Sequence, residues 1–251
     1  MNDTTSPSTQ TSTRCRNCDA PLAEGQIFCG HCGQVAEAHR LTLGSIGHEV
    51  MHALFHVDQS IFALLKGLLL RPGHLARDYV EGRRKRYFGP FGFVVITAGL
   101  ATFLIAVTGA QWFAPVTDSA VQGILTRHIN LVILLQTPIL TALCALFFWK
   151  ERLHYAEHLV LVAYTSGVRM LYLSFVAAPV MYFTHRTSGD PAIIAGYYGP
   201  WLVYFSFAAV QFYRGSRGMT VLKSVIAATL NQVLTMAGIY IFIYTYERMS
   251  G

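Results

Sequence analysis

The sequence predicts an all-α, polytopic membrane protein with about five transmembrane helices, preceded by a small N-terminal module and an interfacial amphipathic helix. Three observations support this fold class. Hydrophobic residues make up 53% of the chain. Charged residues make up only 13%, against about 25% in an average soluble domain. The formal net charge of +6 does not indicate nucleic-acid binding, because the basic residues flank long apolar runs.

A helix needs about 20 mostly apolar residues to cross the hydrocarbon core of a bilayer. Five windows meet this requirement, and together they make up a transmembrane domain at 89–251. The expected spans are about 90–113, 129–149, 159–183, 197–213 and 221–246. The fourth is the weakest of the five.

The orientation follows from the Lys and Arg residues near the spans, because cytoplasmic loops carry the excess of positive charge. Alternate loops are rich and poor in these residues, and the segment before the first span is the richest. The chain is therefore expected to have its N-terminus in the cytoplasm and its C-terminus outside. The basic residues that decide this are Arg71, Arg77, Arg83, Arg84, Lys85, Arg86, Lys150, Arg152, Arg214, Arg217 and Lys223 on one side, and Arg127, Arg186 and Arg248 on the other.

The N-terminal module begins after a polar tail, residues 1–13, that is expected to be disordered. Two C-x2-C pairs follow within 14–34, Cys15 with Cys18 and Cys29 with Cys32. Such pairs form two knuckles that direct four thiolates to one metal ion, the arrangement of a four-sulfur zinc ribbon. We expect one structural Zn²⁺ that stabilises a module with almost no core of its own. A redox-active C-x2-C pair is the alternative.

Residues around the cysteines are assigned structural roles. Gly30 and Gly33 are expected to supply the positive φ that tight knuckle turns require. Phe28 is expected to form a small apolar plug beneath the metal. No nucleic acid is expected as a partner, because acidic residues between 14 and 40 oppose the few basic ones.

The segment 41–88 is expected to form a cytoplasmic amphipathic helix, up to Leu70, followed by a basic juxtamembrane stretch. Apolar residues recur every three or four positions between Leu41 and Leu70, and polar residues occupy the opposite face. The basic stretch is expected to contact anionic phospholipids. Its lipid-facing residues are Arg83, Arg84, Lys85 and Arg86.

Two short motifs raise the prospect of a second metal site. His48-Glu49-Val50-Met51-His52 matches H-E-x-x-H, in which two imidazoles bind zinc and the Glu is a general base. His154 to His158 matches the inverted H-x-x-E-H form. A shared site would use His48 and His52 with Glu157 or His158 as ligands and Glu49 as the catalytic base. In the simpler interpretation, His48 and His52 lie on the solvent-facing side of an interfacial helix. His154 and His158 then lie at the start of a span.

Arg169 falls near the middle of the third expected span, where a charge is unfavourable unless it faces the protein interior. No carboxylate lies in another span to pair with it. Gln136, Gln211, Asn231 and Gln232 are candidate hydrogen-bond partners. The open alternatives are an Arg that bonds only to protein groups and an Arg that meets an anionic ligand or lipid head group.

The chain resembles a bacterial family known as domain of unknown function 3667, whose members join a short zinc ribbon to a multi-span membrane domain. The resemblance covers most of 14–169 and, loosely, the rest. Cys18 is followed by Asp19 where such ribbons often have Gly, which suggests a looser first turn. The resemblance implies this layout and a bacterial inner membrane, and it implies no known activity. The matching segments are the four cysteines, 28–34, 48–58, 71–73, 79–84, 87–91 and 157–160.

The sequence favours a non-enzymatic inner-membrane protein of unknown activity. Its zinc ribbon and basic segment would interact with the lipid bilayer or with an unidentified cytoplasmic protein partner. One alternative is a metal-dependent membrane enzyme, most simply a hydrolase, that uses the His and Glu residues above. The other is a transporter of an anionic solute that meets Arg169. The sequence fixes neither a substrate nor the oligomeric state.

Overall fold

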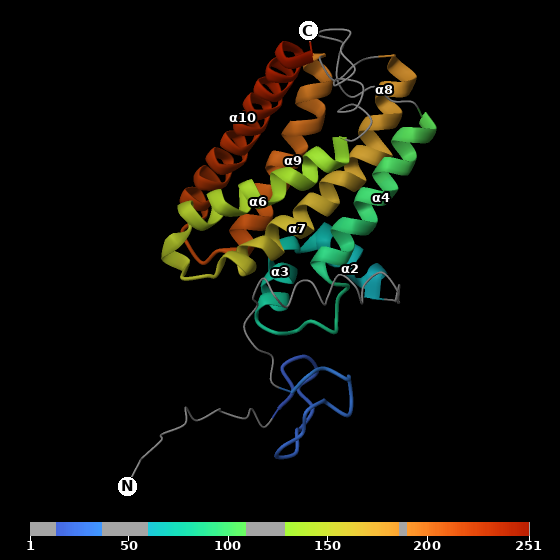
Figure 1. Ribbon diagram of the computed structural model, residues 1–251. Helices are drawn as coiled ribbons and strands as arrows, with labels where there is room; N and C mark the ends of the chain where they lie inside the picture. Colours follow the sequence, from blue (N-terminus) through green and yellow to red (C-terminus); the bar gives the residue numbers. More distant parts are fainter. Residues whose placement is uncertain (1–13, 37–59, 109–128, 186–189, 251) are drawn as a thin grey trace.

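The computed structural model describes residues 14–36, 60–108, 129–185 and 190–250 (Figure 1). Within these ranges the N-terminal module contains only isolated bridges and no strand, and the rest is helical. The helices are α2 (Ser60–Leu70), α3 (Pro72–Val80), α4 (Pro90–Thr108), α6 (Ile129–Phe147), α7 (Tyr155–Tyr172), α8 (Ala178–Thr184), α9 (Pro191–Phe212) and α10 (Arg217–Ser250).

Three of the helices are long and apolar enough to cross a membrane. The first is the continuous helix Tyr155–Thr184, in which a π-helical turn at Leu173–Ala177 joins α7 to α8. The others are α9 and the greater part of α10. The chain is therefore consistent with a membrane protein. The weakest window in the sequence, 197–213, lies within one of these three helices.

The other two expected spans coincide with α4 and α6, which have 19 residues each. At 1.5 Å per residue each is roughly 28 Å long, slightly less than the hydrocarbon core of a typical bilayer. Three helices thus have the length and composition of membrane spans, and the count of five stays a prediction.

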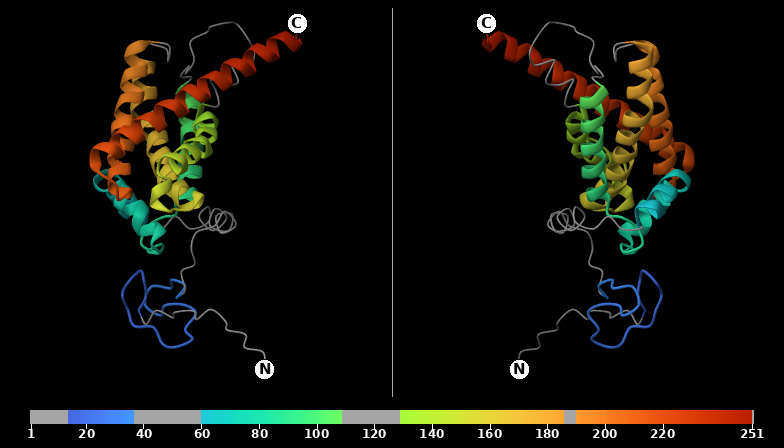
Figure 2. Two further views of the ribbon diagram at one scale, coloured as in Figure 1. Left: turned by 90° about the vertical axis from the view of Figure 1, so that its left-hand side faces the viewer. Right: turned by 90° about the vertical axis from the view of Figure 1, so that its right-hand side faces the viewer.

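Helix α7 lies at the centre of the bundle and contacts α4, α6, α9 and α3. In the continuous helix Tyr155–Thr184, which contains α7, 67% of the most apolar membrane-length stretch is buried inside the structure. The corresponding share for α10 is 22%. Close approach to α4 depends on Gly167, where a Cβ atom would lie 2.5 Å from the ring of Phe93. Helix α10 packs on α6 and α9, and its C-terminal part leans away from the other helices (Figure 2).

Helix α3 lies in the segment that the sequence assigned to a basic juxtamembrane stretch. It begins after Arg71, whose backbone is not helical, and Pro72 occupies its first turn, where a missing N–H is tolerated. Its backbone packs directly on α9: a Cβ at Gly73 would lie 2.0 Å from the carbonyl oxygen of Ala208. The Gly73 N–H also donates to Gln211 Oε1 at 3.1 Å. Part of the expected surface stretch is therefore an integral element of the bundle.

The N-terminal module and the end of α10 lie at opposite ends of the molecule (Figure 1). The module lies past one end of the helical bundle, the end where α4 and α7 begin and where α6 and α9 end. We refer to this as the ribbon end of the bundle, and to the other as the far end.

Candidate functional site

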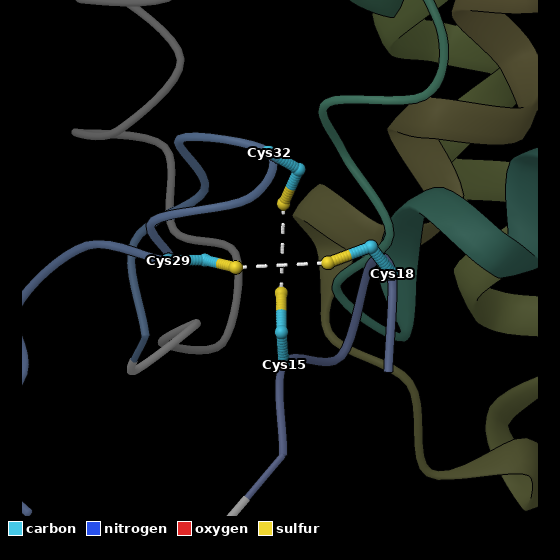
Figure 3. A group of neighbouring side chains, drawn as sticks. All are labelled: Cys15, Cys18, Cys29 and Cys32. Atoms are coloured by element: carbon cyan, nitrogen blue, oxygen red, sulfur yellow. Dashed lines mark hydrogen bonds between the residues drawn. The ribbon is translucent and has the colours of Figure 1, made fainter. Parts of the chain in front are cut away.

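The Sγ atoms of Cys15, Cys18, Cys29 and Cys32 all lie within 4.8 Å of one another. Figure 3 shows the four sulfurs converging on one point, two from each C-x2-C pair. Cys15 and Cys32 sulfurs are 3.6 Å apart, as are those of Cys18 and Cys29. A tetrahedral ion with metal–sulfur bonds of about 2.3 Å would separate its ligands by about 3.8 Å. The donor set therefore fits a closed four-coordinate metal site, as the spacing predicts.

The two knuckles repeat one backbone pattern. The N–H of Asp19 donates to the carbonyl of Cys15 at 2.9 Å, and the N–H of Gly33 donates to that of Cys29 at 2.8 Å. Both donors have positive φ, 57° for Asp19 and 69° for Gly33. The expectation for Gly33 is confirmed, whereas that for Gly30 is wrong, because the turn needs its left-handed residue directly after the second cysteine. Asp19 takes this position in the first knuckle, since Asp tolerates that conformation better than most residues.

The module has no apolar plug. Phe28 is 58% exposed, so the expectation that it would lie beneath the metal is wrong. Its backbone forms an isolated bridge with Val35, the counterpart of the bridge between Arg14 and Pro21, and its ring points outward. In residues 14–36 the only buried side chains classed as hydrophobic are Cys15 and Cys29. The sulfurs themselves form the centre of the module.

Backbone N–H groups favour thiolates at the second knuckle. The N–H of Cys32 lowers the pKa of Cys29. Burial raises the pKa of Cys32, but hydrogen bonds, chiefly from the N–H of Gln34, lower it to about 6. The N–H of Ala20 lowers the pKa of Cys18, but burial and the neighbouring sulfurs raise it to about 12. Without a cation the cluster thus retains protons, and a bound metal would favour full ionisation.

Gln34 connects the module to the bundle. Its buried side chain donates from Nε2 to the carbonyl of Gly82 at 2.6 Å. Its Oε1 accepts from the N–H groups of Arg84 and Lys85, at 3.2 and 3.4 Å. One amide therefore fixes the second knuckle to the loop between α3 and α4. Sequence reasoning missed this role, because a single glutamine beside a knuckle has no signature of its own.

The four basic residues expected to face lipid lie in this same loop. Arg83 pairs with Asp78 at 2.8 Å, and its side chain remains half-exposed. Arg84 is partly buried, with its guanidinium carbon 5.8 Å from the centre of the Tyr79 ring. Lys85 and Arg86 are exposed. Three of the four side chains are thus accessible at the ribbon end.

The expected second metal site is described only in part. His48, Glu49 and His52 lie in 37–59, outside the described residues. Glu157 is buried and accepts the N–H of His154 at 2.8 Å, which caps the first turn of α7.

His158 is buried too, and its Nδ1 lies 2.8 Å from the hydroxyl of Tyr213. Among the described residues, only the four cysteines group three or more His, Cys, Asp or Glu ligand atoms. Glu157 and His158 thus have structural partners, and the second metal stays a prediction.

Arg169 lies inside the bundle and is 4% exposed. It donates from Nη1 to Gln136 Oε1 at 2.7 Å, from Nε to the hydroxyl of Tyr197 at 3.0 Å, and from Nη2 to Gln232 Oε1 at 3.4 Å. Its guanidinium carbon lies 4.3 Å from the centre of the Trp201 ring. The structure brings Arg169 together with Gln136 and Gln232.

The other two amides considered from the sequence lie elsewhere. Gln211 accepts from Gly73, and Asn231 is buried with no partner for its Oδ1 among the described residues. The aromatic partners on α9 were missed, because Tyr and Trp near a span end are typical of the membrane interface.

A family model described as protein of unknown function (DUF3667) matches residues 58–102. This match confirms the family resemblance seen in the sequence. The matched segment includes α2, α3, the loop held by Gln34 and most of α4. No curated protein and no solved structure matches the chain.

Proposed function

We propose that the chain is a five-span protein of the bacterial inner membrane that presents a structural zinc ribbon at the cytoplasmic edge of its bundle. The ribbon and the adjacent basic loop would form a docking surface for a cytoplasmic protein or for anionic phospholipids. The observation that supports this proposal is the attachment of the four-cysteine module to the bundle. The Gln34 side chain fixes the module by hydrogen bonds to residues 82–85.

Zinc is the metal that this donor set favours. Four Cys ligands with no open position are typical of structural zinc sites, in which the metal holds the fold together. The near absence of other buried side chains in residues 14–36 supports the same role. A structural metal leaves the outer surface of the ribbon available for binding.

The distribution of charge supports the proposed orientation. Arg214 and Lys223 lie near the ribbon end, as do Lys150, Arg152 and the basic loop. At the far end of the described chain Arg248 stands near the end of α10. An excess of Lys and Arg at the ribbon end favours a cytoplasmic location for it.

The surface of the ribbon offers a place for a partner. Ile27, Phe28 and Val35 expose apolar side chains, and we call these three residues the apolar ribbon patch. Exposed apolar residues on a module this small are typical of interaction surfaces. Lys85 and Arg86 add exposed positive charge on the loop that seats the ribbon. A partner with an apolar anchor and acidic residues would complement both features.

The test compares proteins cross-linked to the full-length chain in cells with those cross-linked to the variant with Cys29→Ser and Cys32→Ser. Partners should be lost in the variant while insertion into the membrane is retained. A variant with Ile27→Ala and Phe28→Ala, which keeps all four cysteines, separates the surface from the metal. It should also lose partners. Unchanged partners in both variants would refute the proposal.

Metal analysis of the purified protein separates this proposal from the hydrolase alternative. We expect one zinc per chain, lost with the cysteines. A second metal that survives the cysteine changes and is lost on His48→Ala with His158→Ala would instead support an enzyme.

A further inference from the structure

Among the described residues, no negatively charged side chain contacts Arg169. Its three hydrogen-bond partners, Gln136, Tyr197 and Gln232, are all neutral. No carboxylate among the described residues forms an ion pair with it. The guanidinium group of Arg carries a positive charge in proteins, so Arg169 is a buried cation. A buried cation in an apolar bundle therefore has dipoles around it and no counter-ion from the described residues.

The hydrogen-bonding capacity of this guanidinium is only partly used. Arg has five N–H donors in a planar fork, and three of them take part in the bonds to described residues. Two donors remain, one on each terminal nitrogen. A guanidinium with a free N–H on each terminal nitrogen can donate charge-assisted hydrogen bonds to an oxyanion.

A second donor without a partner lies in the same place. Trp201 is 4% exposed, and its ring contacts the Arg169 guanidinium. Its indole Nε1, which can only donate, has no hydrogen-bond partner in the described structure. Buried Trp N–H groups usually find an acceptor. The absence of one beside an Arg with spare donors indicates that the missing component is an acceptor.

The position along four helices places these groups at one depth. Arg169 is about 21 Å from the start of α7, and Gln232 is about 22 Å from the start of α10, both measured from the ribbon end. Gln136 is about 10 Å from the start of α6, and Tyr197 about 9 Å from the start of α9, both measured from the far end. The cluster thus lies deep in the bundle, near the midpoints of Tyr155–Thr184 and α10. Tyr197 and Gln232 are partly exposed on its margin.

We propose that Arg169 and Trp201 form a binding site for an oxyanion of the phosphate or carboxylate class within the membrane domain. Gln136, Tyr197 and Gln232 orient the guanidinium from three sides, and the anion would accept from its remaining N–H groups and from the indole. A small solute and a lipid head group both present such an oxyanion, and the two arms of the test distinguish them. This site does not depend on the ribbon.

The experiment uses the full chain with Trp112→Phe and Trp149→Phe, so that Trp201 is the only tryptophan and can be excited selectively at about 295 nm or above. The protein is held in dodecyl maltoside without phosphate and titrated in two arms, with sodium phosphate and with phosphatidylglycerol in mixed micelles. Sodium chloride at equal ionic strength is the reference. A saturable change in Trp201 emission is expected in at least one arm. A response to phosphate identifies a solute site, and a response to phosphatidylglycerol alone identifies a lipid head-group site.

Three variants decide whether Arg169 is responsible. Arg169→Gln should weaken the response at least about tenfold, because it removes a charge-assisted pair of hydrogen bonds. Arg86→Gln, which removes an exposed charge outside the bundle, should leave it unchanged. Gln136→Glu places a carboxylate against the guanidinium, so it should raise the Tm of the anion-free protein and abolish the response. This last variant remains informative if Arg169→Gln does not fold.

No saturable change with either titrant, or an equal response in the Arg169→Gln or Gln136→Glu protein, would overturn the proposal. Arg169 would then be a structural residue held by neutral acceptors alone.

Discussion

The ribbon and the helical bundle achieve order by different means. In the ribbon Ile27, Phe28 and Val35 are exposed, and the four sulfurs occupy the place of a core. In the bundle a continuous apolar core surrounds α7, from Leu75 and Phe93 to Phe205 and Ala227. One part therefore depends on a few ligand bonds, and the other on many small contacts. A change at a single residue should thus affect the two parts very differently.

The largest effect is expected on loss of the metal. A chelator, or Cys29→Ser with Cys32→Ser, should unfold residues 14–36 and leave the bundle intact, because structural zinc contributes apparent binding energies of about 10–16 kcal/mol. Hydrogen exchange should show unprotected amides in the ribbon and unchanged protection in α7. Ribbon amides that stay protected from exchange without metal would show that the metal does not hold the ribbon together.

In the bundle, the addition of a single methyl group at Gly73 should test how closely α3 packs on α9. Gly73→Ala places a Cβ 2.0 Å from the Ala208 carbonyl and 2.7 Å from the Phe212 nitrogen, both backbone atoms that cannot rotate away. Overpacking of this kind costs about 1–3 kcal/mol or more, so Tm should fall. Gly99→Ala is the matched control, because no atom lies within 4 Å of its Cβ and the position is helical. Equal Tm values for the two variants would show that α3 is not tightly packed.

A smaller effect is expected where the two parts meet. Gln34→Ala removes the bonds to residues 82–85 and leaves backbone groups of a partly buried loop without partners, which costs about 1–3 kcal/mol. The amides of Arg84 and Lys85 should exchange faster while zinc content stays at one per chain. Gln26→Ala, which removes a bond confined to the ribbon, serves as the control. Unchanged exchange at Arg84 would mean that the contact does not hold the ribbon in place.

The smallest effect is expected at the surface of the connecting loop. Arg83→Gln breaks the ion pair with Asp78, but both groups reach solvent, so the loss should be at most about 1 kcal/mol. The Tm difference should shrink as salt is added, because screening weakens the pair. A large, salt-independent loss would assign Arg83 a packing role.

The sequence predicted best what depends on local spacing. Two C-x2-C pairs are enough to form two knuckles, so the four-sulfur cluster was found from four residues. The left-handed turn was misassigned at Gly30, because glycine permits a positive φ but does not require it; the turn lies at Gly33, and at Asp19 in the first knuckle.

Long-range partners were less predictable. Helix α3 has nine residues, and Leu75, Ala76 and Tyr79 alternate with charged neighbours, so its buried face was hidden within a basic segment. The partners Gln136 and Gln232 of Arg169 followed from the rule that a membrane-buried charge needs polar neighbours. The contact of Arg169 with Trp201 did not follow from the sequence. Only the packing of α9 on α7 brings this aromatic ring against the guanidinium.

The Gln34 contact can also be viewed as a binding equilibrium between two tethered partners. The ribbon acts as a ligand of the 82–85 loop, and because the two belong to one chain their association is intramolecular. Loss of the Gln34 amide should weaken this association while the covalent connection stays intact. The ribbon could then be released and recaptured without any change in its metal site or in the bundle.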